Sequence, residues 1–281
     1  MSFGPSPWQQ TNWDWRAAGN FICGGAGAGL LVFAALSGAA GAALAGLLLA
    51  GLALAGAGLA CVWLEIGRPL RALHVFFNPR SSWMTREAIT ATLLMVVGIV
   101  AVVAVPGCKW AAAALALAFV YCQGRMLQAA KGIPAWREPL LAPLFLATGL
   151  AEGGGLFFLT LPLHEAGSLS LLVLFCAMTL ARVFVWLGYR RRVAPVAAPQ
   201  AREALDRAGR VLQLVGTLAP LALALAIATG AIAAAQVPWV AAVAGLAATT
   251  AGAYMKLAIV TRAGFNQGFA LAHLPVRGAS T

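Results

Sequence analysis

The chain has 281 residues, of which 62% are hydrophobic and only 10% are charged, and its mean hydropathy is +0.87. These values exclude a soluble globular domain, because so little charge could not cover the surface of a folded chain in water. The formal net charge of +11 does not indicate nucleic-acid binding, because the basic residues flank long apolar runs, as the positive-inside rule expects. The composition predicts an all-α integral membrane protein.

Apolar runs of about 20 residues, long enough to cross a hydrocarbon core of roughly 30 Å, recur about eight times along the chain. The predicted spans are Ala17–Ser37, Gly41–Leu64, Ala88–Val105, Trp110–Leu127, Leu140–Leu161, Ser168–Tyr189, Val211–Ala235 and Val240–Val260. They divide the chain into an N-terminal interfacial segment (1–16), two four-helix halves (17–130 and 131–260) and a C-terminal tail (261–281).

The segment before the first span lacks the basic start of a signal peptide, so we expect the first span to be retained. Its residues Trp8, Trp13 and Trp15 fit an aromatic belt at the membrane surface. Of 19 Lys and Arg residues, only Lys109 falls in a loop on the face opposite the termini. The positive-inside rule therefore predicts a multi-pass protein with cytoplasmic termini.

The first two spans are rich in Gly and Ala, including Gly25-xxx-Gly29. Small residues let helices approach closely in lipid, so we interpret these positions as packing positions. The five cysteines show no C-x-x-C spacing and mostly lie in apolar runs, which predicts small buried side chains. All histidines lie in loops or in the tail, which disfavours a haem held by histidines on the spans.

The connection Leu64–Glu87 gathers two glutamates, four arginines and a histidine in a chain that is otherwise poor in charge. Glu65 ends the second span, and Arg68 follows about one helical turn later. Tyr121 and Arg125 are four residues apart and therefore share one face of the fourth span. Charged groups at such depths line a cavity or pair with each other, which predicts a functional site at the boundary between membrane and cytoplasm.

Glu152 lies near the middle of the fifth span, directly before Gly153–Gly155. Two interpretations stay open for it, namely a role in proton transfer or in a cavity, and a hydrogen-bonded structural role. Arg182 in the sixth span and Lys256 in the eighth could be its partners or could extend to the cytoplasmic interface. For these two cations a structural role is favoured.

The stretch Glu65-Ile-Gly-Arg-Pro-Leu-Arg-Ala, followed by Ser81-Ser-Trp-Met-Thr-Arg-Glu87, resembles the membrane-anchor subunits of the dimethyl sulfoxide reductase and polysulfide reductase type. Further agreement with these anchors comes from Arg125, Ile133-Pro-Ala-Trp136, Pro143 and Arg262-Ala-Gly. With eight spans as well, the resemblance covers nearly the whole chain. Where the sulfoxide reductase anchors have His-Leu-Gly, with the histidine implicated at the quinol site, this chain has Glu65-Ile-Gly, so a carboxyl group replaces an imidazole there.

The resemblance implies a subunit that exchanges electrons between the quinone pool and a four-cluster iron–sulfur subunit, which in turn serves a molybdenum- or tungsten-containing catalytic subunit. It implies that the chain binds quinone (ubiquinone or menaquinone) and lies in a bacterial-type inner membrane. The positions of the histidines and the spacing of the cysteines predict neither haem nor an iron–sulfur cluster in this chain. Within the family the chain looks most like the anchor of phenylacetyl-CoA:acceptor oxidoreductases, which oxidise a CoA thioester and reduce quinone. A reductase anchor that oxidises quinol for sulfur- or sulfoxide-type acceptors is the alternative.

On this hypothesis the quinone site is predicted to comprise Glu65, Arg71, His74, Trp83, Arg86, Tyr121 and Arg125. Glu65 would carry protons, with Glu152 as a second proton-transfer residue, and aromatic side chains would enclose the ring. Residues predicted to dock the iron–sulfur partner, or to serve only as positive-inside anchors, are Arg68, Arg80 and Arg137.

Two functions of other classes stay open. A passive scaffold would tether the complex without binding quinone. A small-molecule transporter would need a path across the bilayer and discontinuous helices, for which the glycines after Glu152 are the only indication.

Overall fold

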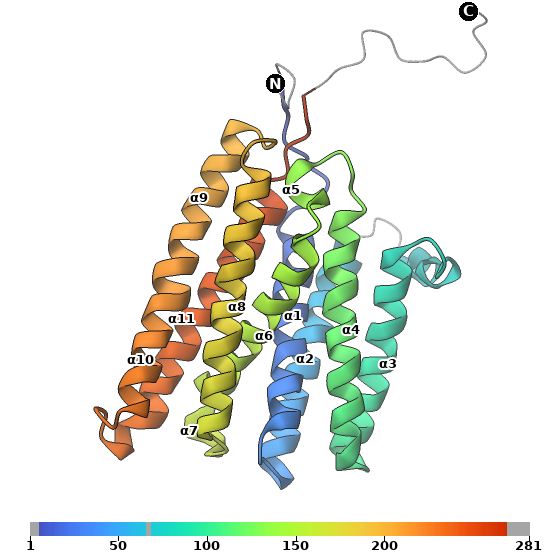
Figure 1. Cartoon of the computed structure of the whole chain (residues 1–281). Coiled ribbons are helices and arrows are strands. Elements are labelled where there is room, and N and C mark those ends of the chain that lie inside the picture. The colour runs from blue at the N-terminus through green and yellow to red at the C-terminus, as the bar shows by residue number, and fades with distance from the viewer. Residues whose placement is uncertain (1–5, 66–68, 269–281) are drawn as a thin grey trace, which may run out of the picture.

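The computed structural model describes residues 6–65 and 69–268 of the chain. In this part of the chain, eight helices are long and apolar enough to cross a membrane, and they run side by side as one bundle (Figure 1). The long helices are α1 (Trp15–Leu36), α2 (Gly41–Glu65), α3 (Trp83–Val103), α4 (Lys109–Gln128), α6 (Leu141–Leu159), α8 (Leu169–Val193), α9 (Pro199–Gln213) with η3 (Leu214–Leu218) and α10 (Ala219–Ala228), and α11 (Val237–Leu257) with η5 (Ala258–Arg262). The short ones are η1 (Pro69–Phe77), η2 (Pro106–Cys108), α5 (Pro134–Arg137), α7 (Leu161–His164) and η4 (Ala234–Gln236). The predicted all-α membrane fold is confirmed.

Two helices, α3 and α9, begin at least five residues before the predicted spans. The seventh span was expected to begin at Val211, but α9, η3 and α10 form one continuous helix over Pro199–Ala228, whose first turns are polar. The third was expected to begin at Ala88, but α3 begins at Trp83 because the Ser82 hydroxyl caps it, accepting a hydrogen bond from the Thr85 N–H at 3.3 Å. The residues Trp83–Glu87 therefore lie on a helix and not in the connection.

α1 and α6 lie at the centre of the bundle and contact each other, and each of them also contacts α4 and α11. The close approach depends on glycine, because a Cβ added to Gly153 would lie 1.9 Å from the carbonyl carbon of Gly29. On the α2 side of α1, a Cβ added to Gly27 would lie 2.5 Å from the Gly51 carbonyl oxygen. The predicted packing role of the small residues in α1 and α2 is thereby confirmed.

The three consecutive glycines of α6 face three different neighbours. Gly153 meets the backbone of α1, Gly154 meets the rings of Phe33 and Phe175, and Gly155 meets the backbone of α11 at Gly245. α6 continues without a break from Leu141 to Leu159. The discontinuity that would favour a transporter is therefore absent from this helix.

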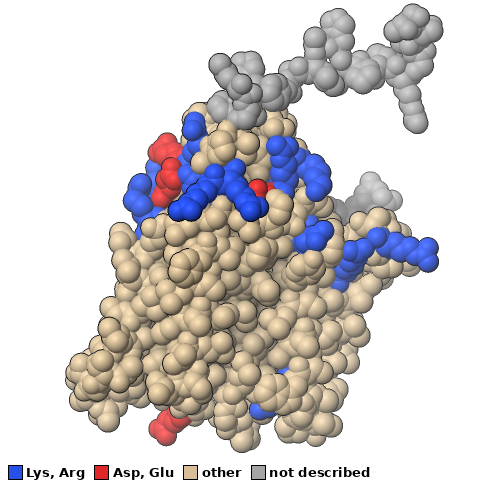
Figure 2. Space-filling model, in the orientation of Figure 1, with Lys and Arg blue, Asp and Glu red and all other residues tan. Residues whose placement is uncertain are grey.

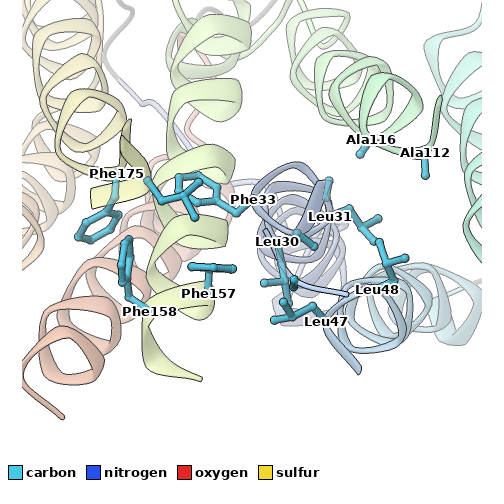
Figure 3. Packing of buried hydrophobic residues seen from close by; sticks show 14 of the residues in the cluster. Leu30, Leu31, Phe33, Leu47, Leu48, Ala112, Ala116, Phe157, Phe158 and Phe175 are labelled. Atoms are coloured by element: carbon cyan, nitrogen blue, oxygen red, sulfur yellow. The ribbon is translucent and has the colours of Figure 1, made fainter. Parts of the chain in front are cut away.

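The buried apolar side chains form two clusters, one toward each end of the helix bundle. Figure 3 shows the first cluster, in which Phe33 of α1 lies toward Phe157 of α6, whereas Leu30 and Leu31 lie toward Leu47 and Leu48 of α2. The second cluster contains the largest buried aromatic side chains, including Trp136, Trp186 and Tyr189.

Of the cysteines, only Cys122 is buried, and the other four are half-buried, so the predicted burial holds for one of the five.

Lys and Arg side chains gather at one end of the molecule, as Figure 2 shows. We call this the basic end; it is formed by the last turns of α2, α4 and α8 and by the first turns of α3, α6 and α9. Here the two terminal segments pair, because the Gln10 N–H donates to the Gly264 carbonyl at 2.8 Å and the Asn266 N–H donates to the Trp8 carbonyl at 3.0 Å. The basic residues and the two terminal segments therefore lie at the same end, and the orientation of this end toward the cytoplasm stays a prediction.

The three N-terminal tryptophans do not behave alike. Trp8 and Trp15 are 62% and 63% exposed, as a membrane-surface belt requires. Trp13 instead stacks on Trp136 with ring centroids 5.2 Å apart, and Trp136 donates from Nε1 to the Ile259 carbonyl at 2.9 Å. Trp13 is therefore half-buried and closes one side of a cavity, and its place in the aromatic belt stays a prediction.

Candidate functional site

The structure divides the predicted quinone site between two separate cavities at the basic end. The carboxylate cavity measures about 200 Å³ and is lined by Trp13, Ala17, Asn20, Phe21, Val62, Glu65, Met84, Glu87 and Met126. The basic cavity measures about 540 Å³ and is lined by Ser81, Trp83, Tyr121, Arg125, Gln128, Ala129, Lys131, Arg137, Pro139, Ala142 and Pro143. The two cavities share no lining residue, so Glu65 and Arg125 do not act on the same small ligand.

Glu87 is the most deeply placed acid of the carboxylate cavity and is only 6% exposed. Its Oε1 accepts a hydrogen bond from the Asn20 side-chain amide at 2.9 Å, and the Asn20 backbone carbonyl accepts one from Gln123 Nε2 at 3.1 Å. The Asn20 Oδ1 atom is buried and has no hydrogen-bond partner. Among the described residues no ion pair involves Glu87, so a carboxyl group supported only by amides borders an apolar space.

Glu65 lies at the mouth of the same cavity, where it is the last residue of α2 and is half-buried. The nearby Arg16 side chain donates to the Leu64 carbonyl at 3.2 Å and pairs with Asp14 at 2.9 Å. Asp14 also caps α1, and its hydrogen bond with Arg16 holds the pKa of the Asp14 carboxyl below its usual range. The cavity thus has one acid inside and one at its mouth, of which only Glu65 was predicted.

Glu87 was missed because it was placed in the connection before the third span. The signal was nonetheless present, since Ser82 followed by an unbroken helical pattern is typical of an N-cap. A helix that begins at Trp83 turns Met84 and Glu87, three residues apart, toward the same side. Both residues line the carboxylate cavity, whereas Trp83 lines the basic cavity.

Of the other predicted residues of the charged segment, those whose side chains the structure describes do not line the carboxylate cavity. Arg68 lies outside the described residues, and so does the side chain of Arg71 in η1. His74 is exposed, with its ring centroid 5.6 Å from that of Phe77, and it lines neither of the two cavities. Arg80 is exposed, and its carbonyl accepts a hydrogen bond from Arg86 Nη2 at 2.7 Å.

The basic cavity is organised around the ring of Trp83. The guanidinium groups of Arg86 and Arg125 lie 4.2 Å and 4.6 Å from the ring centroid. Arg125 also donates from Nη1 to the Tyr121 hydroxyl at 2.9 Å, which confirms that these two residues share one face of α4. Among the described residues, no carboxylate lines this cavity, so its chemistry favours an anion.

A third polar group, the charged cluster, lies deep in the bundle and consists of Glu152, Lys256 and Arg182, all 0% exposed. Lys256 Nζ lies 2.6 Å from Glu152 Oε2 and donates to the Phe21 carbonyl at 2.8 Å. Lys256 therefore pairs with Glu152 and does not extend to the interface, which settles the two placements left open by the sequence. The pair fixes α6, α11 and α1 relative to one another.

Arg182 completes the charged cluster from α8. It donates to the Ala248 carbonyl at 2.9 Å and to the Gly216 carbonyl. Gly216 belongs to the π-helical turn η3, and such a turn leaves carbonyl groups free to accept from a side chain. The Glu152 Oε1 and Arg182 Nε atoms are buried without a hydrogen-bond partner. The role of Glu152 in proton transfer stays a prediction.

Comparison with models of known protein families and with curated protein sequences found no match for this chain. The resemblance to the sulfoxide and polysulfide reductase anchors therefore rests on the quoted motifs and on their positions relative to the spans.

Proposed function

We propose that this chain is the quinone-reactive membrane subunit of an oxidoreductase complex and that the quinone ring binds in the carboxylate cavity. One observation carries this proposal: two carboxyl groups, those of Glu65 and Glu87, and the unpartnered amide oxygen of Asn20 border an otherwise apolar space at the membrane boundary. A quinone ring needs such apolar walls together with hydrogen-bonding groups for its two oxygen atoms.

The dimensions of the cavity support a ring and exclude a whole lipid-soluble quinone. A volume of about 200 Å³ lies below the range of roughly 300–1,000 Å³ that is typical of sites enclosing a larger ligand. Val62 of α2 and Met84 of α3 line the cavity, and Met84 is 44% exposed at the surface of the bundle. An isoprenoid tail would leave between these two helices into the lipid.

The side chains of the cavity suit proton exchange with a bound quinone. When bound, the quinone accepts or releases two electrons together with two protons. Glu87 would hold a proton next to the ring, with its carboxyl group oriented by Asn20, and Glu65 would pass protons between the cavity and the water at the basic end. Phe21 and Trp13 would keep other water away from the ring.

The partners are proposed from the resemblance and from charge. The basic end, which includes the exposed Arg80, would dock a four-cluster iron–sulfur subunit by charge complementarity. That subunit would connect the chain to a molybdenum- or tungsten-containing catalytic subunit that oxidises a cytoplasmic substrate such as an arylacetyl-CoA. The opposite direction, with quinol oxidised for a sulfur- or sulfoxide-type acceptor, is the alternative, and both place the chain in a bacterial-type inner membrane.

The test is a binding titration of the purified chain in nanodiscs with a short-tailed quinone, followed by quenching of tryptophan fluorescence, since Trp13 lines the cavity. A buried hydrogen-bonding group that loses its partner weakens binding by roughly tenfold to 100-fold, so we expect Glu87→Gln, which cannot donate a proton to the quinone, to raise Kd by that factor. The matched control is Glu203→Gln on α9, whose side chain is 74% exposed and which should leave Kd unchanged.

Two results would contradict the proposal. The wild-type chain could show no saturable quinone binding, or Glu87→Gln and Glu65→Gln could bind as tightly as wild type. Turnover of a quinone analogue by membranes with equal amounts of assembled complex extends the test. If both variants keep full turnover and retain the partner subunits, the chain is a passive scaffold and the quinone reacts elsewhere.

A further inference from the structure

We infer that the basic cavity binds the phosphate group of an anionic phospholipid. This inference is independent of the quinone proposal, because the two cavities share no lining residue. At about 540 Å³ the basic cavity falls within the range of roughly 300–1,000 Å³ of small-molecule sites.

The cavity holds three cations that form no ion pair with any acid in the described part of the chain. Arg125, Lys131 and Arg137 line it, and no described Asp or Glu does. Elsewhere on the described chain, the arginines at 16, 190, 192 and 207 each pair with a carboxylate, but none of these ion pairs involves the three cations of the cavity. Arg137 donates only to neutral oxygens, the Lys131 carbonyl and Gln267 Oε1, each at 3.2 Å. The site is therefore complementary to an anion.

Arg125 is held in place before any anion binds. Its guanidinium lies over the Trp83 ring and is bonded to the Tyr121 hydroxyl, while its Nε atom is buried and has no hydrogen-bond partner. A planar guanidinium that is fixed in this way presents its N–H groups to a phosphate with little loss of side-chain freedom. The exposed Lys131 supplies a further donor to the same anion.

The position of the cavity favours a lipid over a soluble anion. Tyr121 is 42% exposed at the basic end of α4, and Leu117, one turn deeper in the bundle, is 38% exposed, so this face of α4 is presented to lipid. On α6, the exposed Pro143 lines the cavity and the half-buried Leu146 follows it. Acyl chains can therefore run along α4 and α6 while the phosphate stays among the cations, as in other basic pockets between membrane helices.

The test compares lipid adducts of the purified chain by native mass spectrometry in phosphatidylglycerol and in phosphatidylcholine. We expect the wild type to retain phosphatidylglycerol preferentially. The variant Arg125→Gln/Lys131→Gln/Arg137→Gln should retain at least roughly tenfold less phosphatidylglycerol than the wild type, because each cation near a lipid surface contributes substantially to binding. The matched control, Arg191→Gln/Arg202→Gln/Arg210→Gln, removes the same charge from the same end and should keep the retention.

A single variant at an exposed cation tests the same site. Because Arg125 is partly buried, the exposed single variant Lys131→Gln is measured as well and should retain several-fold less phosphatidylglycerol. Equal losses in the control variant, or equal retention of phosphatidylcholine, would overturn the inference. If inorganic phosphate alone displaces the lipid, the cavity is a site for soluble anions. If an acidic protein partner covers the three cations and no lipid is bound, the cavity is a docking surface.

Discussion

Glu87 and Glu152 are both buried carboxylates in the same bundle, but their surroundings are opposite. Glu152 faces a cation at 2.6 Å and lies beside glycine contacts that leave no space, whereas Glu87 faces an amide and borders a cavity. A buried acid that is neutralised and enclosed holds helices together. Packing alone does not explain why a buried acid lies beside an open space without a cation. For this reason we propose a role in proton exchange for Glu87.

The two sites meet on α1, through consecutive residues. Asn20 donates to Glu87, and the carbonyl of Phe21 accepts from Lys256. α1 is also the helix that contacts α2, α4, α6 and α11. A disturbance of the charged cluster should therefore reach the carboxylate cavity through α1, whereas removal of the Glu87 carboxylate should leave the cluster intact.

The largest expected effect concerns the charged cluster. Glu152→Gln or Lys256→Met should lower the free energy of unfolding by roughly 3–5 kcal/mol, because each leaves the other charge buried without its partner. The double variant should recover much of this loss, since no charge of the pair is left unpaired. Unfolding midpoints in detergent measure the effect, and single variants as stable as wild type would mean that the pair does not hold the bundle together.

The next effect concerns the contact between α1 and α6. Gly153→Ala should destabilise the bundle by roughly 1–3 kcal/mol or more, because the added Cβ would overlap the backbone of Gly29 and force the two helices apart. The matched control is Gly46→Ala in α2, where nothing lies within 4 Å of an added Cβ. There we expect unchanged or slightly higher stability, since alanine favours a helix by about 1 kcal/mol over glycine. Equal behaviour of the two variants would contradict the close packing.

Glu87→Gln gives the direct contrast with Glu152→Gln. It should change the free energy of unfolding by less than about 1.5 kcal/mol, because the new amide can still accept from Asn20 and no cation loses its partner. The same variant should nonetheless weaken quinone binding. A loss of stability as large as that of Glu152→Gln, measured in the same detergent, would show that Glu87 is a structural acid as well.

The sequence was sufficient for the features that depend on composition and failed for those that depend on the rotation of helices. Apolar runs and flanking charges predicted the spans and the basic end. The pairing of Lys256 with Glu152 was one of two placements that the sequence left open, and it could not be decided there because it depends on which faces of α6 and α11 meet. The single quinone site was predicted from neighbours in sequence, but Trp83 and Met84 are adjacent residues on α3 and line different cavities.

The smallest expected effect on stability belongs to Glu65, which lies at the mouth of the cavity. Glu65→Gln should change the free energy of unfolding by no more than about 0.5 kcal/mol, as for most surface substitutions, because the side chain is half-buried and none of the ion pairs of the described residues includes it. Its effect on quinone binding should be coupled to that of Glu87. If both carboxyl groups serve one ligand, the double variant will weaken binding by a factor that differs from the product of the two single effects. If the two effects simply multiply, Glu65 and Glu87 act independently, and the proposed path of protons from the mouth to the ring is wrong even if the ring binds where we propose.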